Sequence, residues 1–478
     1  MRLRRAGTVF IEFGVENFRS IRERITLSMV AAKLRDKNES LDENNVVKVS
    51  AKLSLLRSAV IYGANASGKS NLLKALDVMG KIVLNSARWQ AKEKIPAEPF
   101  VLNAEFSKKP SLFEIVFLMN GLQYRYGFEV TVDQVVREWL FFVPTNREIP
   151  LFLRDEDGID IRDRFKEGKG YEKSTLENNL FLSVVAKFKS GGIADRILDW
   201  FSNNCRILIA SSDLGYFPNT IECIESGKYK TEILEMVRQF DLGISDILVK
   251  QILKQGFSTA YLVKEPSALE SVNPRELNGN EIPYPYRKGD FNTELRTRHS
   301  VLDNEGKAED EIELSAKAME SEGTLKLIAL MGPIIEILSH GSALFIDEID
   351  FRFHPAITAA LFRLFNSPRT NPNNAQLICA SHDTSLLDRY LFRRDQINFI
   401  EKGRFAASRL YSLSEFKMKS LADRAKTVNI QESIERNYLL GRYGAIPYIG
   451  FFSEKFINGM ETGHKPVDLE QNTTKSLT

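Results

Sequence analysis

The sequence has 478 residues, of which 65 are Lys or Arg and 63 are Asp or Glu, so its formal net charge is +2. With 43% hydrophobic and 27% charged residues the chain is typical of a globular protein, which excludes a disordered one. A charge this close to zero argues against a wholesale coat of nucleic acid and leaves room for a local basic patch.

The cysteines and the apolar segments of the sequence indicate where the protein is located and whether it binds a metal. The three cysteines, Cys205, Cys223 and Cys379, are too few and too widely spaced for a disulfide framework or a cysteine-type zinc site. No apolar segment follows the basic start of the chain, so we predict no signal peptide. No window is apolar enough over its whole length to span a bilayer. We therefore expect a cytoplasmic protein with reduced thiols and no membrane partner.

The N-terminal part of the sequence predicts strands followed by a helix. Residues 10–21 alternate with period two, and residues 25–30 indicate a second strand. Residues 58–62 form an uninterrupted apolar run, as expected of a strand buried on both faces. This strand leads directly into the loop 63–70, after which apolar residues recur at three- and four-residue steps up to residue 83, as in an amphipathic helix.

The middle of the chain changes from strands to helices. Residues 112–143 predict an antiparallel meander whose first turn contains Asn120-Gly121, and residues 151–161 predict a further hairpin. Residues 171–249 are expected to be mainly helical. Residues 265–311 predict a long polar loop, in which basic residues around 287–299 precede acidic ones.

The last third of the chain alternates between helices and buried strands. Residues 323–338 and 356–365 have helical periodicity, whereas residues 342–346 and 376–380 are short apolar runs.

Residues 63–70 satisfy the complete pattern G-x-x-x-x-G-K-[ST] between a predicted strand and a predicted helix, which is the context that the pattern requires. Backbone N–H groups of such a loop, together with the helix N-terminus, cradle phosphates. Lys69 would add a positive charge, and Ser70 would offer its hydroxyl to Mg²⁺. The residues expected to bind ATP here are Gly63, Asn65, Ser67, Gly68, Lys69, Ser70 and Asn71.

A second set of residues follows two of the buried strands. The strand 342–346 ends at Asp347 and Glu348, so both acids should lie at the carboxyl edge of the sheet, where α/β proteins bind ligands. We expect Asp347 to hold Mg²⁺ with Ser70, and Glu348 to orient and deprotonate an attacking water. The strand 376–380 ends at Ser381-His382, and Ser321-Glu-Gly323 opens the helix before the acidic strand.

Phosphate loop, S-x-G, strand-Asp-Glu and strand-Ser-His follow one another in the order used by ABC-type ATPase heads. These motifs, with Asn17-Phe-Arg-Ser20, Asp350 and His354-Pro355, resemble the RecF/SMC/OLD group of ABC ATPases. More narrowly, residues 438–447 and the meander at 113–130 resemble the AbiL/RloA-type ATPases of bacterial abortive-infection and anti-phage loci.

This resemblance implies an α/β fold: an ABC-ATPase head, with a mixed sheet around the phosphate loop, an antiparallel β lobe and a mainly helical insertion. The implied organisation is an N-terminal part of the head (1–165), a helical and polar insertion (166–310), a C-terminal part of the head (311–455) and a polar tail (456–478).

The resemblance also implies a homodimer, or a higher homo-oligomer, in which two heads sandwich ATP and Mg²⁺. Ser321 and Gly323 of one subunit would complete the γ-phosphate site of the other. His382 would contact the γ-phosphate, Asp350 would lie across the seam, and hydrolysis at Glu348 would release the dimer. Two departures stand out: Glu322 replaces a consensus glycine, and the Q-loop glutamine has only Gln90 as a candidate by position.

The favoured function is an ATP-dependent sensor or regulatory subunit of an anti-phage system. Too little chain follows Asp383 for a Toprim nuclease, so the effector, a nuclease or toxin that may be Toprim-like, would be a separate protein. A nucleic acid or phage component would be the trigger, with residues 287–311 and the insertion as candidate recognition elements. One alternative is a RecF-like DNA-repair ATPase that clamps DNA, which salt-dependent DNA binding would reveal. Another is a non-hydrolysing ATP-bound scaffold.

Overall fold

The computed structural model describes residues 8–34, 39–144, 147–209, 217–240, 242–253, 291–403, 405–416 and 434–447. The polar tail expected at 456–478 and the first part of the expected polar loop, up to residue 290, lie outside the described residues.

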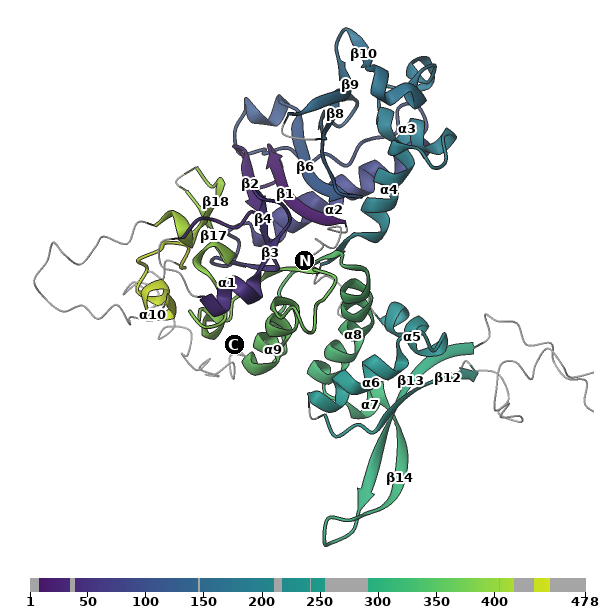
Figure 1. Cartoon of the computed structure of the whole chain (residues 1–478), viewed down its shortest axis with the longest axis vertical. Helices are drawn as coiled ribbons and strands as arrows, with labels where there is room; N and C mark the ends of the chain where they lie inside the picture. Colours follow the sequence, from purple (N-terminus) through teal and green to yellow (C-terminus); the bar gives the residue numbers. More distant parts are fainter. Residues whose placement is uncertain are drawn as a thin grey trace, which may run out of the picture.

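The elements follow one another along the chain as shown in Figure 1. The strands are β1 (Val9–Glu16), β2 (Ile25–Ser28), β3 (Val46–Lys48), β4 (Ser54–Leu56), β5 (Ser58–Tyr62), β6 (Ser111–Met119), β7 (Leu122–Val130), β8 (Val135–Val143), β9 (Ile149–Asp155), β10 (Gly158–Ile161), β11 (Cys205–Leu208), β12 (Asp246–Leu253), β13 (Phe291–Leu302), β14 (Ala308–Ser315), β15 (Ala343–Ile346), β16 (Gln376–Ala380), β17 (Ile397–Lys402) and β18 (Ser408–Ser412). The α-helices are α1 (Glu39–Asn45), α2 (Lys69–Asn85), α3 (Phe181–Phe188), α4 (Ile193–Asn203), α5 (Phe217–Glu225), α6 (Lys230–Gln239), α7 (Ala316–Met319), α8 (Glu322–His340), α9 (Pro355–Asn366) and α10 (Ile434–Leu439).

A seven-stranded sheet in the order β10-β9-β8-β7-β6-β1-β2 forms an antiparallel lobe. The turn between β6 and β7 is Asn120-Gly121, and both residues have positive φ, at 54° and 79°. That conformation explains why this dipeptide marks the hairpin in the sequence. The meander and the 151–161 hairpin are therefore confirmed.

A second sheet carries the phosphate-loop strand at its centre, in the order β11-β15-β16-β5-β17-β18. The strands from β11 to β17 run parallel, and β18 pairs antiparallel with β17. Every residue of β5, β15 and β16 is buried, as their uninterrupted apolar sequences predict. The edge strand β11, however, comes from a region expected to be helical, because four residues are too short a run to signal a strand among helices.

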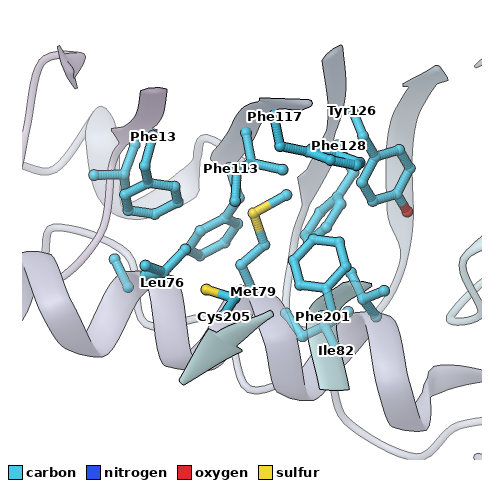
Figure 2. Packing of buried hydrophobic residues seen from close by; sticks show 14 of the residues in the cluster. Phe13, Leu76, Met79, Ile82, Phe113, Phe117, Tyr126, Phe128, Phe201 and Cys205 are labelled. Carbon is cyan, nitrogen blue, oxygen red and sulfur yellow. The ribbon is translucent and has the colours of Figure 1, made fainter. Parts of the chain in front are cut away.

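The side chains of this second sheet alternate between two cores. Ala59 and Ile61 of β5 join the core shared with α2 and the lobe, whereas Val60 and Tyr62 face the core shared with α8 and α9. Figure 2 shows α2 lying under the lobe strands, with Met79 and neighbouring apolar residues against aromatic rings from β6 and β7. The molecule is thus layered as lobe sheet, α2, central sheet, and helices α8 and α9. This arrangement confirms the predicted α/β class, with a phosphate-loop core and an antiparallel lobe.

The prediction of a polar loop over residues 265–311 is wrong for residues 291–311. Residues 291–315 form the paired strands β13 and β14, which with β12 make a three-stranded sheet. In Figure 1 the β13–β14 end projects from the rest of the molecule. Because β14 is largely solvent-exposed and highly charged, neither burial nor alternation of apolar residues could mark it as a strand in the sequence.

Helix α8 is apolar and long enough to pass a composition test for a membrane span, but 67% of its most apolar window is buried inside the protein. It therefore behaves as a core helix. Pro333 lies inside it and lacks the N–H that would bond the carbonyl of Ala329. Thr220 of α5 replaces this donor, because its Oγ1 donates to Ala329 O over 2.7 Å and accepts from Gly332 N over 3.2 Å.

We predict that Thr220→Val destabilises the protein by about 1–3 kcal/mol, since it keeps the shape of the side chain but leaves two buried backbone groups without this partner. Urea unfolding would measure the loss. Thr358→Val is the matched control: Thr358 is equally buried, yet its hydroxyl has no partner among the described residues, so the change should be neutral or stabilising. Equal effects of the two substitutions would contradict the role given to Thr220.

Candidate functional site

The loop 63–70 connects β5 to α2 at the carboxyl edge of the central sheet. Gly68 has φ 118°, a conformation that side-chain-bearing residues rarely adopt, and a Cβ at Gly63 would come within 2.2 Å of the carbonyl oxygen of Ile400. Asn65 lies exposed at the tip, Ser70 is partly buried in the first turn of α2, and Lys69 is only 5% exposed. The loop predicted from the pattern therefore has the backbone shape that its glycines suggested.

Side chains from two distant segments support this loop. Ser408 Oγ, at the start of β18, donates to the carbonyl oxygen of Ser67 over 2.6 Å and lies 2.8 Å from Ser20 Oγ. Asn71 Nδ2 also donates to Ser20 Oγ over 2.8 Å. A Cβ at Gly68 would lie 2.2 Å from Ser408 Oγ. Asn71 was expected to contact the ligand, but its side-chain amide donates to Ser20, which helps to hold the loop in place.

Two buried polar atoms at the site have no partner among the described residues. They are Ser67 Oγ and Asp347 Oδ1. Ser67 is 3% and Asp347 4% exposed, so leaving these oxygens unpaired is costly. Nucleotide and Mg²⁺ suit these two oxygens chemically, because a hydroxyl can donate to phosphate and a carboxylate with Ser70 can hold a hard cation. When bound, Mg²⁺ would neutralise phosphate charge.

Glu348 follows Asp347 with φ 51°, a conformation uncommon for a residue other than glycine. The turn that carries it is held by Lys326 of α8. Lys326 Nζ donates to the carbonyl oxygens of Glu348 over 3.1 Å and of Phe351 over 2.9 Å, and lies 5.1 Å from the centre of the Phe353 ring. None of the sequence motifs includes Lys326, although a lone lysine within the apolar run 325–331 is a signal for a buried polar contact.

His382 lies beyond the carboxyl end of β16, next to the acidic turn. Its backbone N–H donates to both carboxylate oxygens of Asp350, over 3.2 and 3.1 Å. Asp350 was expected to lie across a dimer seam, but its carboxylate accepts these hydrogen bonds from His382 of its own chain. The following residue, Asp383, is tied to β5, because Tyr62 OH donates to its carbonyl oxygen over 2.8 Å.

The charges of these residues act on one another. Burial lowers the pKa of Lys69 to about 8, although the carboxylates of Asp347, Glu348 and Asp350 oppose this shift. Burial, and then the positive charge of Lys69, lowers the pKa of His382, against the same three carboxylates. His382 is therefore neutral at pH 7 and can donate one hydrogen bond. Lys69, His382 and the three carboxylates therefore influence one another at the carboxyl ends of β5, β15 and β16.

Ser321 and Gly323 lie at the start of α8 and make other contacts. Ser321 is exposed and caps the helix by accepting from Thr324 N over 3.1 Å. A Cβ at Gly323 would lie 2.6 Å from the carbonyl oxygen of Arg352, and Glu322 forms an ion pair with Arg352 over 3.2 Å. The S-x-G segment is thus linked to the turn after Glu348, while Ser321 faces solvent.

Gln90 does not fit the position expected of a glutamine that contacts Mg²⁺. It follows the far end of α2, whose 17 residues rise roughly 25 Å from the phosphate loop. Its carbonyl accepts from Asn178 and its N–H donates to Glu93. Gln90 is therefore part of a surface turn.

The sequence matches the family model described as "AAA domain, putative AbiEii toxin, Type IV TA system" over residues 58–388, more than two thirds of the chain. The chain belongs to this family. Membership confirms the coarser prediction, a P-loop ATPase that binds nucleotide. Among curated proteins, none matches the sequence.

Three solved structures share distant similarity with the chain. The SMC head domain from Thermotoga maritima is 13% identical, with 84% of this chain and 98% of that one covered and a TM-score of 0.35. The recombination mediator RecF bound to ATP is 13% identical, with coverages of 86% and 100% and a TM-score of 0.34. The Smc head domain with a coiled coil and joint from Pyrococcus yayanosii is 10% identical, with coverages of 85% and 97% and a TM-score of 0.36. At such scores these likenesses add nothing to what the site geometry itself indicates.

The lowered pKa of Lys69 predicts a pH-dependent affinity for nucleotide. ATP should bind the protonated amine, so affinity should hold up to about pH 8 and then fall, by up to about tenfold per pH unit, as the free protein loses this proton. Calorimetric titration with MgATP between pH 7 and pH 9.5 measures this. An affinity that stays constant across the range would contradict a role for the Lys69 charge.

Proposed function

We propose that this protein is an ABC-type ATPase that binds and hydrolyses MgATP between two copies of its head, and that it serves as the regulatory subunit of a cytoplasmic anti-phage system. The observation that carries the ATP site is the pair of buried unpartnered oxygens, Ser67 Oγ and Asp347 Oδ1, together with the buried Lys69, whose amine interacts electrostatically with Asp347. Together they leave a donor, an acceptor and a positive charge that a magnesium–phosphate group would satisfy.

Each residue has a defined role in this proposal. Gly63, Asn65, Gly68 and the amides around Ser67 surround the phosphates, and Lys69 supplies the charge that compensates them. Ser70 and Asp347 hold Mg²⁺. Glu348 orients the attacking water and accepts its proton, and the left-handed backbone at Glu348 aims its side chain. His382, neutral at pH 7, donates to the γ-phosphate.

The proposed dimer is based on the exposed N-terminus of helix α8. Ser321 lies in solvent at the N-terminus of a 19-residue helix, whose positive dipole end favours an anion. We propose that this end meets the γ-phosphate held by a second copy. Lys326, on the same helix, donates a hydrogen bond to the carbonyl oxygen of Glu348. A movement of the helix on docking at Ser321 would therefore shift the turn that carries Glu348.

The defence role rests on a different kind of support. The description of the family names a "putative AbiEii toxin" and a "Type IV TA system", and the sequence motifs resemble those of AbiL/RloA-type ATPases. In the proposed organisation, residues 1–165 and 311–455 form the head and residues 166–310 the insertion. A separate nuclease or toxin, controlled by the nucleotide state of the head, would be the effector, and a nucleic acid or phage component would be the trigger. RecF-like DNA clamping and a non-hydrolysing scaffold are the competing functions.

We predict that Glu348→Gln accumulates an ATP-bound dimer, because nucleotide can still bind while the water is no longer activated. Lys69→Ala should stay monomeric, since it loses the charge that opposes the phosphates. Light scattering coupled to size exclusion, with and without MgATP, measures the mass of each variant. If wild type and Glu348→Gln show the same ATP lifetime and equal biological activity, hydrolysis is irrelevant and the scaffold function is correct.

A mixing experiment tests whether each site is shared between two copies. Neither Lys69→Ala nor Ser321→Arg should hydrolyse ATP alone, but a mixture should regain activity, because each mixed dimer contains one intact phosphate loop facing one intact Ser321. The Ser321→Arg change also removes a helix cap worth about 1 kcal/mol, so its folding is checked by circular dichroism. Full turnover by Ser321→Arg alone would show that the site is complete within one chain.

A further inference from the structure

We propose that Thr297 and His299 of β13 are positioning residues for ATP hydrolysis, because they hold Glu320 and thereby set the place of Ser321. Through this contact the β12–β13–β14 sheet controls the half of the ATP site that one head lends to a second copy. The inference rests on the proposed dimer and names the element that regulates it.

Glu320, the residue before Ser321, is fixed by two side chains of β13. Thr297 Oγ1 donates to Glu320 Oε1 over 2.6 Å, and His299 Nε2 lies 2.8 Å from the same oxygen. Thr297 is fully buried, and the side chain of Glu320 is only 10% exposed. Hydrogen bonds to a carboxylate are about twice as strong as those between neutral groups, and a nearly buried carboxylate that loses them is costly. Glu320 should therefore follow β13 when the strand moves.

Ser321 lies between two anchored acids. Glu320, on one side, is bound to β13, whereas Glu322, on the other, pairs with Arg352 over 3.2 Å in the turn that follows Glu348. Ser321 itself is exposed, so its place relative to a second copy depends on these neighbours and not on burial of its own side chain. Three consecutive residues thus connect the β12–β13–β14 sheet to the turn that carries the proposed hydrolytic acid.

The β13–β14 hairpin is anchored at one end and exposed to solvent at the other. Near Thr297 it joins a core with α5, α6 and α8, in which Leu295 is buried. Beyond His299 the strands leave this core, since Val301 is 40% exposed and the end of the hairpin projects from the molecule in Figure 1. Glu320 is held at the boundary between the two parts. A partner that bends the exposed end would therefore act on β13 at the point where it holds Glu320.

Two substitutions at one position separate positioning from packing. Thr297→Val keeps the shape of the side chain but removes the hydroxyl, so kcat for ATP hydrolysis should fall roughly tenfold to a hundredfold, as expected for a group misplaced by about 1 Å. Thr297→Ser keeps the hydroxyl and loses a methyl group, so it should retain most of the activity. The affinity for MgADP should not change in either variant, because MgADP lacks the γ-phosphate that Ser321 would meet. Steady-state hydrolysis and calorimetric titration measure these quantities.

Mixing shows in which half of the site the substitution acts. Thr297→Val should regain activity when mixed with Lys69→Ala, because each mixed dimer contains one intact phosphate loop facing one correctly placed Ser321. Mixing Thr297→Val with Ser321→Arg should bring no gain, since both variants are impaired in the same half. A residue needed only for the stability of its own head would impair its own phosphate loop as well, so Lys69→Ala would not rescue it.

Glu320→Ala is a second variant, for which Glu313→Ala is the matched control. Glu313 faces Arg298 across the strands, so it lies on the face of the sheet opposite to Thr297, and it pairs with Arg298 and Lys250. Both substitutions remove a paired carboxylate at this sheet. Only Glu320→Ala should lower kcat, by at least as much as Thr297→Val does.

Three results would overturn the inference and leave the dimer standing. They are a wild-type kcat in Thr297→Val, a larger loss in Thr297→Ser than in Thr297→Val, and a mixture with Lys69→Ala that revives Ser321→Arg but not Thr297→Val. If neither variant gains activity on mixing with Lys69→Ala, the shared site itself is wrong, and the inference falls with it.

Discussion

The phosphate loop depends on one hydrogen-bonded contact, in which Ser408 Oγ reaches the carbonyl oxygen of Ser67 and lies beside Ser20 Oγ. This contact joins three segments: the N-terminal turn before β2, the loop after β5 and the start of β18. It can form only because Gly68 lacks a Cβ, which would otherwise lie 2.2 Å from Ser408 Oγ. The glycine of the pattern thus serves two needs, since it allows a positive φ and it admits the serine that fixes the loop. Ser408 also lines a pocket of about 530 Å³ between residues 22–26 and 403–410.

Electrostatics divide the carboxyl edge of the central sheet into two sides. On one side, three carboxylates lie near the buried Lys69. Burial lowers the pKa of this lysine to about 8, and the carboxylates oppose that shift. A bound phosphate would compensate the lysine, and a divalent cation would compensate the carboxylates. On the other side, Arg22 and Arg24 form ion pairs with Glu23 and Glu114 close to the exposed Phe405.

Sequence reasoning predicted those parts of the fold whose physics is local. β5, β15 and β16 are short apolar runs buried on both faces, and the loop 63–70 needs glycine at defined positions, so both could be recognised directly. β14 could not, because half of its residues are charged and most of them are exposed to solvent. Ser20 and Ser408 could not be paired either, since their contact spans 388 positions and a serine in a strand has no distinctive pattern. Lys326 differs from these, because a lysine buried in an apolar helix must find polar partners, and that requirement was visible in the sequence.

The segment 438–447, noticed in the sequence only through resemblance, acquires a physical role from its packing. The ring of Tyr438 stacks on Phe399 of β17 and lies 5.8 Å from Tyr62, the last residue before the phosphate loop. Tyr62 in turn bonds the carbonyl oxygen of Asp383, and Glu435 of α10 accepts from Thr384 over 3.0 Å. Helix α10 therefore contacts both the strand that leads into the phosphate loop and the turn that follows His382. A displacement of that turn would therefore have to move α10 with it or break these contacts.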